Sequence, residues 1–310
     1  MSATKPVVAV LASVYAWTKA RAFLLARAEK SGTRVGPEYL GWFTSWLLYR
    51  YSLLMGVRLA SENDFTPLDD AKKYMIVWHP HGFLAWGAMF IFGKMAVTGQ
   101  PGGREWFAMV APVLFKIPIF GDALLMVNAR RVAKPVVEGL LNQGRQIAIQ
   151  PGGVKEQLQS RHDQEIAFFP ANLGFIRMAI KFQRHLLPVY IFGENQIFRR
   201  LEGLDGVFDK IFRSSGVPVP ALSGKLGLPF LGLMPRSGNI HVRWGRHIDP
   251  GPAEDEPSDS RVEEVFGRYL AEIQRIFDEN AFNCLPPEVA AKGLLIKRVP
   301  GAGQLPRSKL

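Results

Sequence analysis

Two histidines stand where a short apolar segment of the chain ends. His79 and His81 flank Pro80 and precede Gly82, directly after the apolar residues Tyr74–Trp78. Histidine is the side chain best suited to act as a general base at neutral pH, and a proline restricts the turn that presents it. A buried hydrogen-bonded turn or an HxH metal pair are the alternatives. The other four histidines complete no recognised metal-binding array, so acid–base chemistry is favoured and no metal is expected.

A second polar cluster follows another short apolar segment. Pro151, Gly152 and Gly153 come after Gln146–Gln150, and Glu156 lies three residues further along. Glycines permit backbone angles that turn N–H groups toward an oxyanion or a phosphate. A carboxylate one helical turn beyond could orient a histidine ring, as the acid does in a catalytic triad. Taken alone, the segment is equally compatible with a simple tight turn.

Other reaction chemistries lack their signatures in this chain. It contains no GxSxG nucleophile elbow, no Walker A loop and no GxGxxG after a strand. The single cysteine, Cys284, can form no internal disulfide, so a reducing compartment is the default expectation. Because Leu285–Pro287 follow it, we place Cys284 in a loop after a helix and interpret it as a small apolar residue.

The segments that would position these clusters alternate between strands and helices. We expect strands at Tyr74–Trp78, Gln146–Gln150, Leu187–Phe192 and Ile240–Trp244, and helices at Val132–Asn142 and Ala171–Gln183. This alternation predicts an α/β fold with a mostly parallel sheet covered by helices on both faces. Three of the strands end in polar or glycine-rich clusters, and open α/β sheets bind ligands beyond the carboxyl ends of their strands. We therefore expect a site at that edge.

The chain is expected to have three parts. These are an N-terminal membrane-associated segment over residues 1–60, a main domain over residues 61–290 and a flexible C-terminal tail over residues 291–310. Within the main domain, the acidic stretch 251–260 (GPAEDEPSDS) predicts an exposed connector. After it, apolar residues recur every three or four positions, which predicts an amphipathic helix over 261–280 that packs back onto the domain.

Two apolar segments near the N-terminus predict helices associated with a membrane. Pro6–Thr18 is followed by basic residues rather than a cleavage site, and it is too short to span a bilayer comfortably. Leu40–Val57 is rich in aromatic residues and interrupted by Arg50, which fits a helix lying in the membrane interface. A covered core helix is the alternative. The uncharged stretch Tyr74–Gly93 resembles a span by hydropathy, but its histidines and its Pro-Gly break favour a strand and a turn.

The charge of the chain bears on its partners. A net charge of +11 favours anionic partners, such as a membrane surface or a phosphorylated small molecule. The chain carries no zinc-finger spacing and no recognisable nucleic-acid-binding module, so we expect no nucleic-acid partner.

Four segments together resemble one enzyme family. Tyr74–Gly82 (YMIVWHPHG), Gln150–Glu156 (QPGGVKE), Leu173–Phe175 (LGF) and Leu187–Asn195 (LPVYIFGEN) have the order and spacing of the type-2 diacylglycerol acyltransferase family. This family includes mono- and diacylglycerol acyltransferases and wax synthases, and it is related to the glycerolipid acyltransferases. The resemblance extends over most of the chain, from about residue 40 to Pro287.

The resemblance implies transfer of a fatty acyl group from acyl-CoA to the hydroxyl of a neutral lipid, with diacylglycerol expected as the acceptor and triacylglycerol as the product. Acyl-CoA would be a co-substrate, and no cofactor is expected. Acylation of monoacylglycerol, a fatty alcohol, or a lysophospholipid or glycerol phosphate remains open. From a different class, a catalytically inactive lipid-binding membrane protein is the alternative.

The resemblance also suggests roles for the polar clusters. Glycerolipid acyltransferases carry an aspartate five residues after a histidine, but here Leu84 and Trp86 stand five residues after His79 and His81. Glu156 is our candidate replacement for the missing aspartate. His79 is interpreted as the base, with His81 orienting or donating, and the N–H groups of Gly152 and Gly153 are expected to stabilise an oxyanion.

Further residues are expected to contact the substrates. Arg130 and Arg131 follow a strand-like stretch, LLMVNA, and could hold a phosphate, although solvated surface arginines are equally compatible. Arg177, Lys181 and Arg184 could attract the phosphates of coenzyme A, whereas Asn172 stands where the family usually has a basic residue. The full set of expected substrate-binding residues is Pro80, Gly82, Gly152, Gly153, Arg130, Arg131, Gly174, Phe175, Arg177, Glu194 and Asn195.

The last three residues suggest a destination in the cell. Ser308, Lys309 and Leu310 form the tripeptide that a peroxisomal import receptor binds, and the preceding Pro300–Pro306 is rich in glycine and proline. A chance tripeptide is the alternative, and the family resemblance suggests the endoplasmic reticulum or lipid droplets instead. We expect a membrane-associated protein of the peroxisome.

Overall fold

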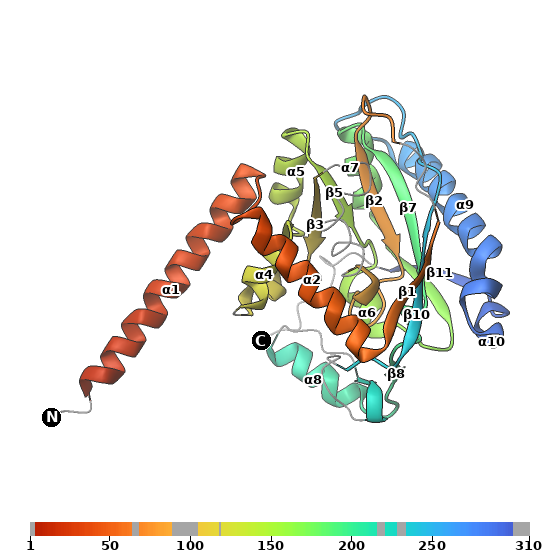
Figure 1. Cartoon of the computed structure of the whole chain (residues 1–310). Coiled ribbons are helices and arrows are strands. Elements are labelled where there is room, and N and C mark those ends of the chain that lie inside the picture. The colour runs from red at the N-terminus through yellow and green to blue at the C-terminus, as the bar shows by residue number, and fades with distance from the viewer. Residues whose placement is uncertain are drawn as a thin grey trace.

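A seven-stranded sheet forms the centre of the protein (Figure 1). The computed structural model describes residues 4–63, 68–88, 105–117, 119–215, 221–227 and 234–299. The strands in spatial order are β1 (Val57–Glu62), β10 (Gly238–Trp244), β7 (His185–Phe192), β2 (Tyr74–His79), β5 (Gln146–Ile149), β3 (Trp106–Val110) and β4 (Ala129–Arg131). All neighbouring pairs are parallel except β10 with β7. The predicted mostly parallel α/β sheet is therefore confirmed.

Helices pack on one face of this sheet. Because successive side chains of a strand point to opposite faces, β2 contributes to two cores. Met75 and Val77 pack in a core with α5 (Lys134–Asn142), α7 (Gly174–Lys181) and α9 (Asp259–Cys284). In Figure 1 the long helix α9 runs alongside β7 and β10. The predicted packing helix is confirmed, and it is longer at both ends than the sequence suggested.

The other face is covered by α2 (Glu38–Met55) and by irregular segments. Ile76 and Trp78 belong to a second core, which also holds Phe83 and Trp86 from the segment after β2. Tyr51 of α2 packs against this core. Both faces of the sheet are thus covered, as predicted, but irregular segments as well as a helix cover this second face.

The other elements connect or flank the sheet. Short helices are α4 (Phe120–Met126), α6 (Gly153–Gln159), α8 (Asp205–Ser215), α10 (Pro287–Ala290) and the 3₁₀ turns Pro112–Lys116 and Lys225–Gly227. Two small sheets pair β6 (Glu165–Pro170) with β11 (Leu294–Val299) and β8 (Arg199–Arg200) with β9 (Leu222–Ser223).

The N-terminal helices differ in how they meet the domain. Helix α1 (Thr4–Ser31) extends away from the body of the protein, whereas α2 lies across it (Figure 1). Helix α2 buries Gly41, Ser45 and Ser52 and leaves its large side chains exposed. Of these, Trp42 is 43% and Trp46 is 39% exposed. The polar and small residues of α2 therefore face the protein, and its aromatic residues face outward.

Within the described ranges, no helix is both long enough and apolar enough to cross a membrane.

Four local expectations differ from the structure. LLMVNA, expected to be strand-like, ends α4 with its first three residues and reaches strand β4 only at Ala129, and Cys284 is the last residue of α9 rather than part of a loop. Residues Leu294–Val299, expected in a flexible tail, form β11 because they pair in parallel with β6. The sheet also begins before residue 61, since Val57 already pairs with β10. Ser308, Lys309 and Leu310 lie outside the described residues.

Candidate active site

The three polar clusters meet at one edge of the sheet. Strands β7, β2 and β5 are neighbours, and they run parallel, so their carboxyl ends lie side by side. His79 is the last residue of β2, and its neighbour across the pair is Tyr190 of β7. The predicted convergence of strand ends is confirmed.

His79 is fully enclosed at this edge. Its side chain has no exposed surface, and its ring packs on Phe169 with ring centroids 4.7 Å apart and on Tyr269 at 6.3 Å. Neither ring nitrogen has a hydrogen-bond partner among the residues that the structure describes. The nearest charge is a carboxylate oxygen of Glu156, 3.7 Å from Nδ1. A buried imidazole of this kind is held in place by packing rather than by hydrogen bonds.

Glu156 lies between the two histidines. Its side chain is buried on α6, and its Oε1 accepts the backbone N–H of His81 at 2.5 Å. The second oxygen faces His79 and the backbone N–H of Phe168, at 3.7 and 3.4 Å. A Cβ atom at Gly152 would collide with this carboxylate, so glycine is required there. The predicted proximity of Glu156 to the histidines is thus observed.

His81 is the more accessible histidine. Its side chain is partly exposed, and its Nδ1 lies 3.2 Å from the carbonyl oxygen of Gly82. Burial lowers the pKa of His81, and the charge of Glu156 opposes this effect. The ring is therefore neutral at neutral pH and carries a lone pair that can accept a proton.

Further contacts hold the turn that carries His81. The side-chain amide of Gln157 donates to the carbonyl of Phe83 at 2.7 Å, and that of Gln150 donates to the carbonyl of Pro80 at 3.4 Å. Gly82 has φ +62°, and a Cβ there would collide with the side chain of Glu194. The turn is thus fixed by residues that follow both β5 and β7.

Glu194 and Asn195 contact buried groups of the protein. Glu194 accepts the backbone N–H groups of Trp86, at 2.7 Å, and Gly87. Burial raises its pKa to about 7. Asn195 donates its side-chain amide to Glu165 at 3.2 Å. Both residues are almost fully buried, so they contact groups inside the protein and do not line an open surface.

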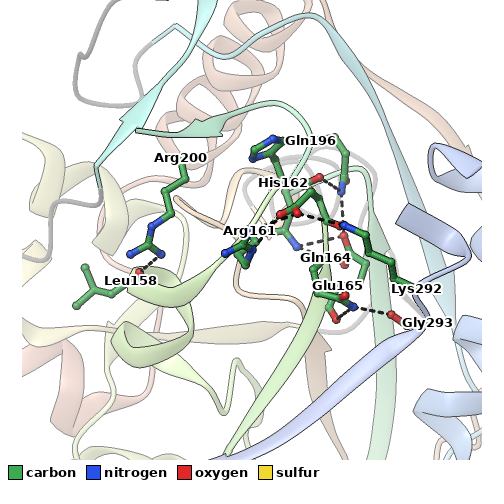
Figure 2. Close-up of polar contacts among 11 residues, drawn as sticks. Leu158, Arg161, His162, Gln164, Glu165, Gln196, Arg200, Lys292 and Gly293 are labelled. Atoms are coloured by element: carbon green, nitrogen blue, oxygen red, sulfur yellow. Dashed lines mark hydrogen bonds and ion pairs between the residues drawn. The ribbon is translucent and has the colours of Figure 1, made fainter. Parts of the chain in front are cut away.

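Glu165 is a buried carboxylate that the sequence did not single out. It accepts hydrogen bonds from the Tyr190 hydroxyl at 2.8 Å and from Gln196 Nε2 at 3.0 Å. Burial raises its pKa, and these donors oppose the rise. Figure 2 shows Glu165 and Gln196 beside Lys292 and Gln164, and the side-chain amide of Gln164 donates to the carbonyl of Gly293. The signal in the sequence was a single acidic residue at the start of the apolar stretch EIAFF.

The proposed phosphate contact by Arg130 is wrong. The guanidinium of Arg130 is fully buried and donates to backbone carbonyls, among them those of Ala28 and Thr33. Arg131 makes a two-pronged ion pair with Glu29 of α1. Both arginines therefore attach the N-terminal helix to the domain, and neither points at a ligand site.

Two basic residues of α7, Arg177 and Lys181, also contact other residues of the protein. Arg177 donates to Asp259 and to the carbonyl of Pro257, and thereby ties α7 to the start of α9. Lys181 lies 4.0 Å from Glu138 and 3.8 Å from Asp255. Both side chains are thus engaged in ion pairs within the protein, and their expected attraction of the phosphates of coenzyme A stays a prediction.

Arg184 and two further residues expected to bind substrate, Phe175 and Gly174, also have contacts within the protein. Arg184 is buried and donates to the carbonyl of Leu141. Phe175 packs in the aromatic core around Phe169, the ring that contacts His79. The N–H of Gly174, at the start of α7, lies 3.4 Å from the side-chain oxygen of Asn172. Phe175 thus belongs to the packing behind the site rather than to an open substrate surface.

Cys284 has no catalytic setting. Its thiol is buried, burial raises its pKa, and Arg243 Nη2 lies 3.5 Å from its sulfur. A thiol with a raised pKa is a poor nucleophile, which agrees with its interpretation as a packing residue.

An open pocket of about 650 Å³ lies at the opposite end of the strands. Lys72, Lys73 and His185, which stand where β2 and β7 begin, contribute to its lining. Asp249 and Pro250 face them. Because parallel sheets place their chemistry at the carboxyl ends of the strands, we assign the site to the histidine end rather than to this pocket.

Comparison with known sequences identifies relatives of the whole domain. A sequence model of the diacylglycerol acyltransferase family matches residues 20–286. Diacylglycerol O-acyltransferase 2-like protein 6 of Mus musculus is 27% identical over 259 residues, which cover 77% of this chain and 74% of the relative. 2-acylglycerol O-acyltransferase 1 of Homo sapiens is 27% identical over 261 residues, 79% of this chain and 76% of the relative.

Two further comparisons concern a relative from a third organism and a solved structure. Diacylglycerol O-acyltransferase 2 of Dictyostelium discoideum is 29% identical over 230 residues, 71% of this chain and 69% of the relative. The crystal structure of the 1-acyl-sn-glycerophosphate acyltransferase PlsC from Thermotoga maritima matches with a TM-score of 0.42 and 18% identity, over 82% of each chain. At that level the structural match adds nothing to the sequence matches.

Proposed function

The chain belongs to the diacylglycerol acyltransferase family, and we propose that it transfers a fatty acyl group from acyl-CoA to the free hydroxyl of diacylglycerol or monoacylglycerol. The relatives are O-acyltransferases, and the matched segment contains every polar cluster of the site. Relatives named for diacylglycerol and for 2-acylglycerol are equally similar to this chain, so both acceptors belong in the proposal.

One observation carries the proposed chemistry. Glu156 accepts the backbone N–H of His81 and lies 3.7 Å from the ring of His79, so one buried carboxylate lies beside both histidines. A histidine that accepts a proton becomes a cation, and a buried carboxylate beside it stabilises that cation. This arrangement suits a reaction that begins by removing a proton from a hydroxyl.

The exposure of the two rings decides which histidine we assign as the base. His79 is fully enclosed, whereas His81 is partly exposed and neutral. We therefore propose that His81 removes the proton from the acceptor hydroxyl, in place of His79 as the sequence suggested. The charge of Glu156 then stabilises the positive charge that forms on His81.

The reaction follows from this assignment. The acceptor oxygen attacks the thioester carbonyl as His81 takes its proton, and a tetrahedral intermediate forms. The backbone N–H groups of Gly152 and Gly153 are proposed to stabilise its oxyanion. When the intermediate collapses, the carbon–sulfur bond breaks, the proton passes from His81 to the departing thiolate, and an ester and free coenzyme A result. No acyl-enzyme intermediate is needed.

A panel of acceptors tests this function. The purified protein is incubated with radiolabelled acyl-CoA and, separately, diacylglycerol, monoacylglycerol, a fatty alcohol and a lysophospholipid, and the products are separated by chromatography. We expect labelled triacylglycerol or diacylglycerol as the main product. Label transferred only to lysophospholipid, or to none of the four acceptors, would contradict the proposal.

We also propose that α2 rests on a lipid surface. Its aromatic residues face outward, with the Trp42 and Trp46 rings stacked 6.4 Å apart, and Arg50 lies over the ring of Trp46. Aromatic and basic residues on one helix face are typical of interfacial helices. The double variant Trp42→Glu/Trp46→Glu should sediment less with phospholipid vesicles, whereas Phe282→Glu, at an exposed aromatic of α9, should not change sedimentation. Equal sedimentation of all three proteins would contradict this surface.

The location in the cell is a separate proposal. Ser308, Lys309 and Leu310 support import by the peroxisomal receptor, with the enzyme at the inner surface of the peroxisomal membrane. A full-length protein with an N-terminal fluorescent tag should give punctate peroxisomal signal that is lost when these three residues are removed. A reticular signal that does not change on their removal would end the idea.

A further inference from the structure

Glu194 occupies the space between the two parts of the loop that follows β2. Its carboxylate lies against Gly82 on one side and Gly87 on the other, and a Cβ atom at either glycine would collide with it. The two oxygens accept the N–H groups of Trp86 and Gly87, where a helical turn begins. The side chain is 1% exposed. The path of the loop is thus shaped around this carboxylate.

The loop that Glu194 holds is the one that carries the proposed base. Glu156 accepts the backbone N–H of His81 near the start of the loop, and Glu194 accepts the backbone N–H groups of Trp86 and Gly87 near its end. A third contact within the loop runs from the N–H of Ala85 to the carbonyl of His81 at 3.1 Å. A movement at Trp86 and Gly87 would therefore be transmitted to His81 through a short, internally bonded segment.

We propose that Glu194 is a positioning residue for acyl transfer, whose carboxylate holds the loop 80–87 in the one arrangement that keeps His81 beside Glu156. This inference rests on the proposed function of the site, because it assigns to Glu194 an effect on that reaction. Glu194 was expected to contact the substrate. We propose instead that it acts on the reaction indirectly, through its hydrogen bonds to Trp86 and Gly87.

The charge on Glu194 is required for this role. A carboxylate accepts both N–H groups strongly, whereas a carboxylic acid carries a proton on one of its two oxygens, and that hydroxyl oxygen is a weaker acceptor. Burial raises the pKa of Glu194 to about 7, the two N–H groups oppose that rise, and Glu165 on β6 adds to it. Within the loop 80–87 itself, His81 is the one titratable residue. As the pH falls through about 7, Glu194 is neutralised and its hydrogen bonds to the loop become weaker.

The raised pKa of Glu194 also affects the stability of the fold, and here a lower pH is favourable. A glutamate in the unfolded chain ionises near its ordinary pKa of 4.5, so between about pH 4.5 and 7 the folded protein binds this proton more tightly. The contribution of Glu194 to stability therefore falls as the pH rises through that window.

The test compares Glu194→Gln with the wild type in three measurements. We expect kcat with diacylglycerol to fall about 10- to 100-fold with little change in KM, because a displaced catalytic group slows the reaction more than it weakens binding. The decline of wild-type kcat on acidification from pH 7.5 to 6.5 should disappear in the variant. Hydrogen exchange of the peptide 82–88 should be at least about tenfold faster in Glu194→Gln, because one N–H has lost its acceptor.

A matched variant separates positioning from folding. Glu272 is also a buried carboxylate that accepts a backbone N–H, from Arg246, but although burial raises its pKa, hydrogen bonds from Arg275 and Arg246 lower it overall. Glu272→Gln should lower the melting temperature and leave the pH dependence of kcat unchanged. If Glu194→Gln does not fold, Glu194→Asp, which keeps the charge but is shorter, should show the same faster exchange and a smaller loss of kcat.

Several outcomes would overturn the inference. They are a kcat of Glu194→Gln within twofold of the wild type, an unchanged exchange rate of peptide 82–88, or a loss of activity that simply follows the loss of folded protein. If the wild type transferred no acyl group, the proposed function would fail, and the exchange measurement would still decide whether Glu194 holds the loop.

Discussion

The two ends of strands β2 and β7 carry the same kinds of titratable side chain, but they use them differently. At the carboxyl end, Glu156 and Glu194 are buried and accept backbone N–H groups. At the amino end, Lys72 and Asp249 line an open pocket, and the rings of His185 and His247 stack 5.2 Å apart. One end encloses its charges in hydrogen bonds, and the other leaves them near solvent.

This difference shows why the open pocket at the amino end is not the better candidate site. Water and salt screen exposed charges, so the interactions of these charges with neighbouring groups are weak. Buried carboxylates that accept backbone N–H groups fix the chain around them and act strongly on nearby rings. The carboxyl end therefore has the fixed geometry that acid–base catalysis needs, and the amino end has only space.

The largest effect should come from His81 at the carboxyl end. His81→Ala removes the proposed base, and we expect kcat to fall by about 10²–10⁴-fold while the protein remains folded. His79→Ala, which removes an enclosed ring, should cost less activity and more stability, because it leaves a cavity beside Phe169. Initial rates and melting temperatures of both variants check this. A more severe loss of kcat in His79→Ala, with the fold intact, would return the role of base to His79.

Glu156→Gln should have the next largest effect. The amide keeps the shape of the side chain but cannot stabilise a histidine cation, so we expect kcat to fall on the order of 10- to 100-fold. The KM for acyl-CoA should change much less, because this charge acts mainly in the transition state. A variant in which only the KM for acyl-CoA rises would show that Glu156 belongs to substrate binding.

Trp86→Phe should have a smaller effect, because it leaves the Glu194 contacts in place. The indole N–H of Trp86 donates to the Ser52 hydroxyl of α2 at 3.1 Å, which links α2 to the loop by a hydrogen bond. Losing a hydrogen bond worth about 1 kcal/mol should lower kcat by about fivefold. Ser52→Ala should reproduce the loss, and the double variant should be no worse than either single one. Additive losses would contradict a shared contact.

The smallest effect is expected at the amino end. His185→Ala alters the stacked rings and the pocket there, about five residues from His79 along the sheet, and should change kcat by less than about twofold. Its pH profile should match that of the wild type. A tenfold loss of kcat in a folded His185→Ala protein would break the distinction between the two ends.

Much of this site could be predicted from the sequence, because its backbone follows a general rule. His79, His81 and Glu156 come after apolar strands, and parallel strands bring such residues to one edge. The partners of the basic residues could not be predicted in the same way. Arg130 and Arg177 are held by Thr33 and Asp259, which lie 97 and 82 residues away in the chain, and only the folded structure brings them together.

The ends of the chain show the same limit. The apolar pattern of α2 predicted a helix, but whether its aromatic face was buried or exposed depended on what lay beside it. Similarly, β11 follows a short helix, and its pairing with β6 crosses about 130 residues of sequence. Deleting residues 1–60 would thus remove most of β1 together with α2, so substitutions on the exposed face of α2 are the sharper experiment.

The position of the acyl group during the reaction tests the central claim most directly. The wild-type protein is incubated with an acyl-CoA that carries a photoreactive diazirine near its thioester, irradiated, and digested for mass spectrometry. If the carboxyl end of the strands is the site, crosslinks will map to the segments 79–88 and 150–157, and unlabelled acyl-CoA will prevent them. Crosslinks confined to the amino-end segments 71–73, 182–185 and 249–252 would contradict the account.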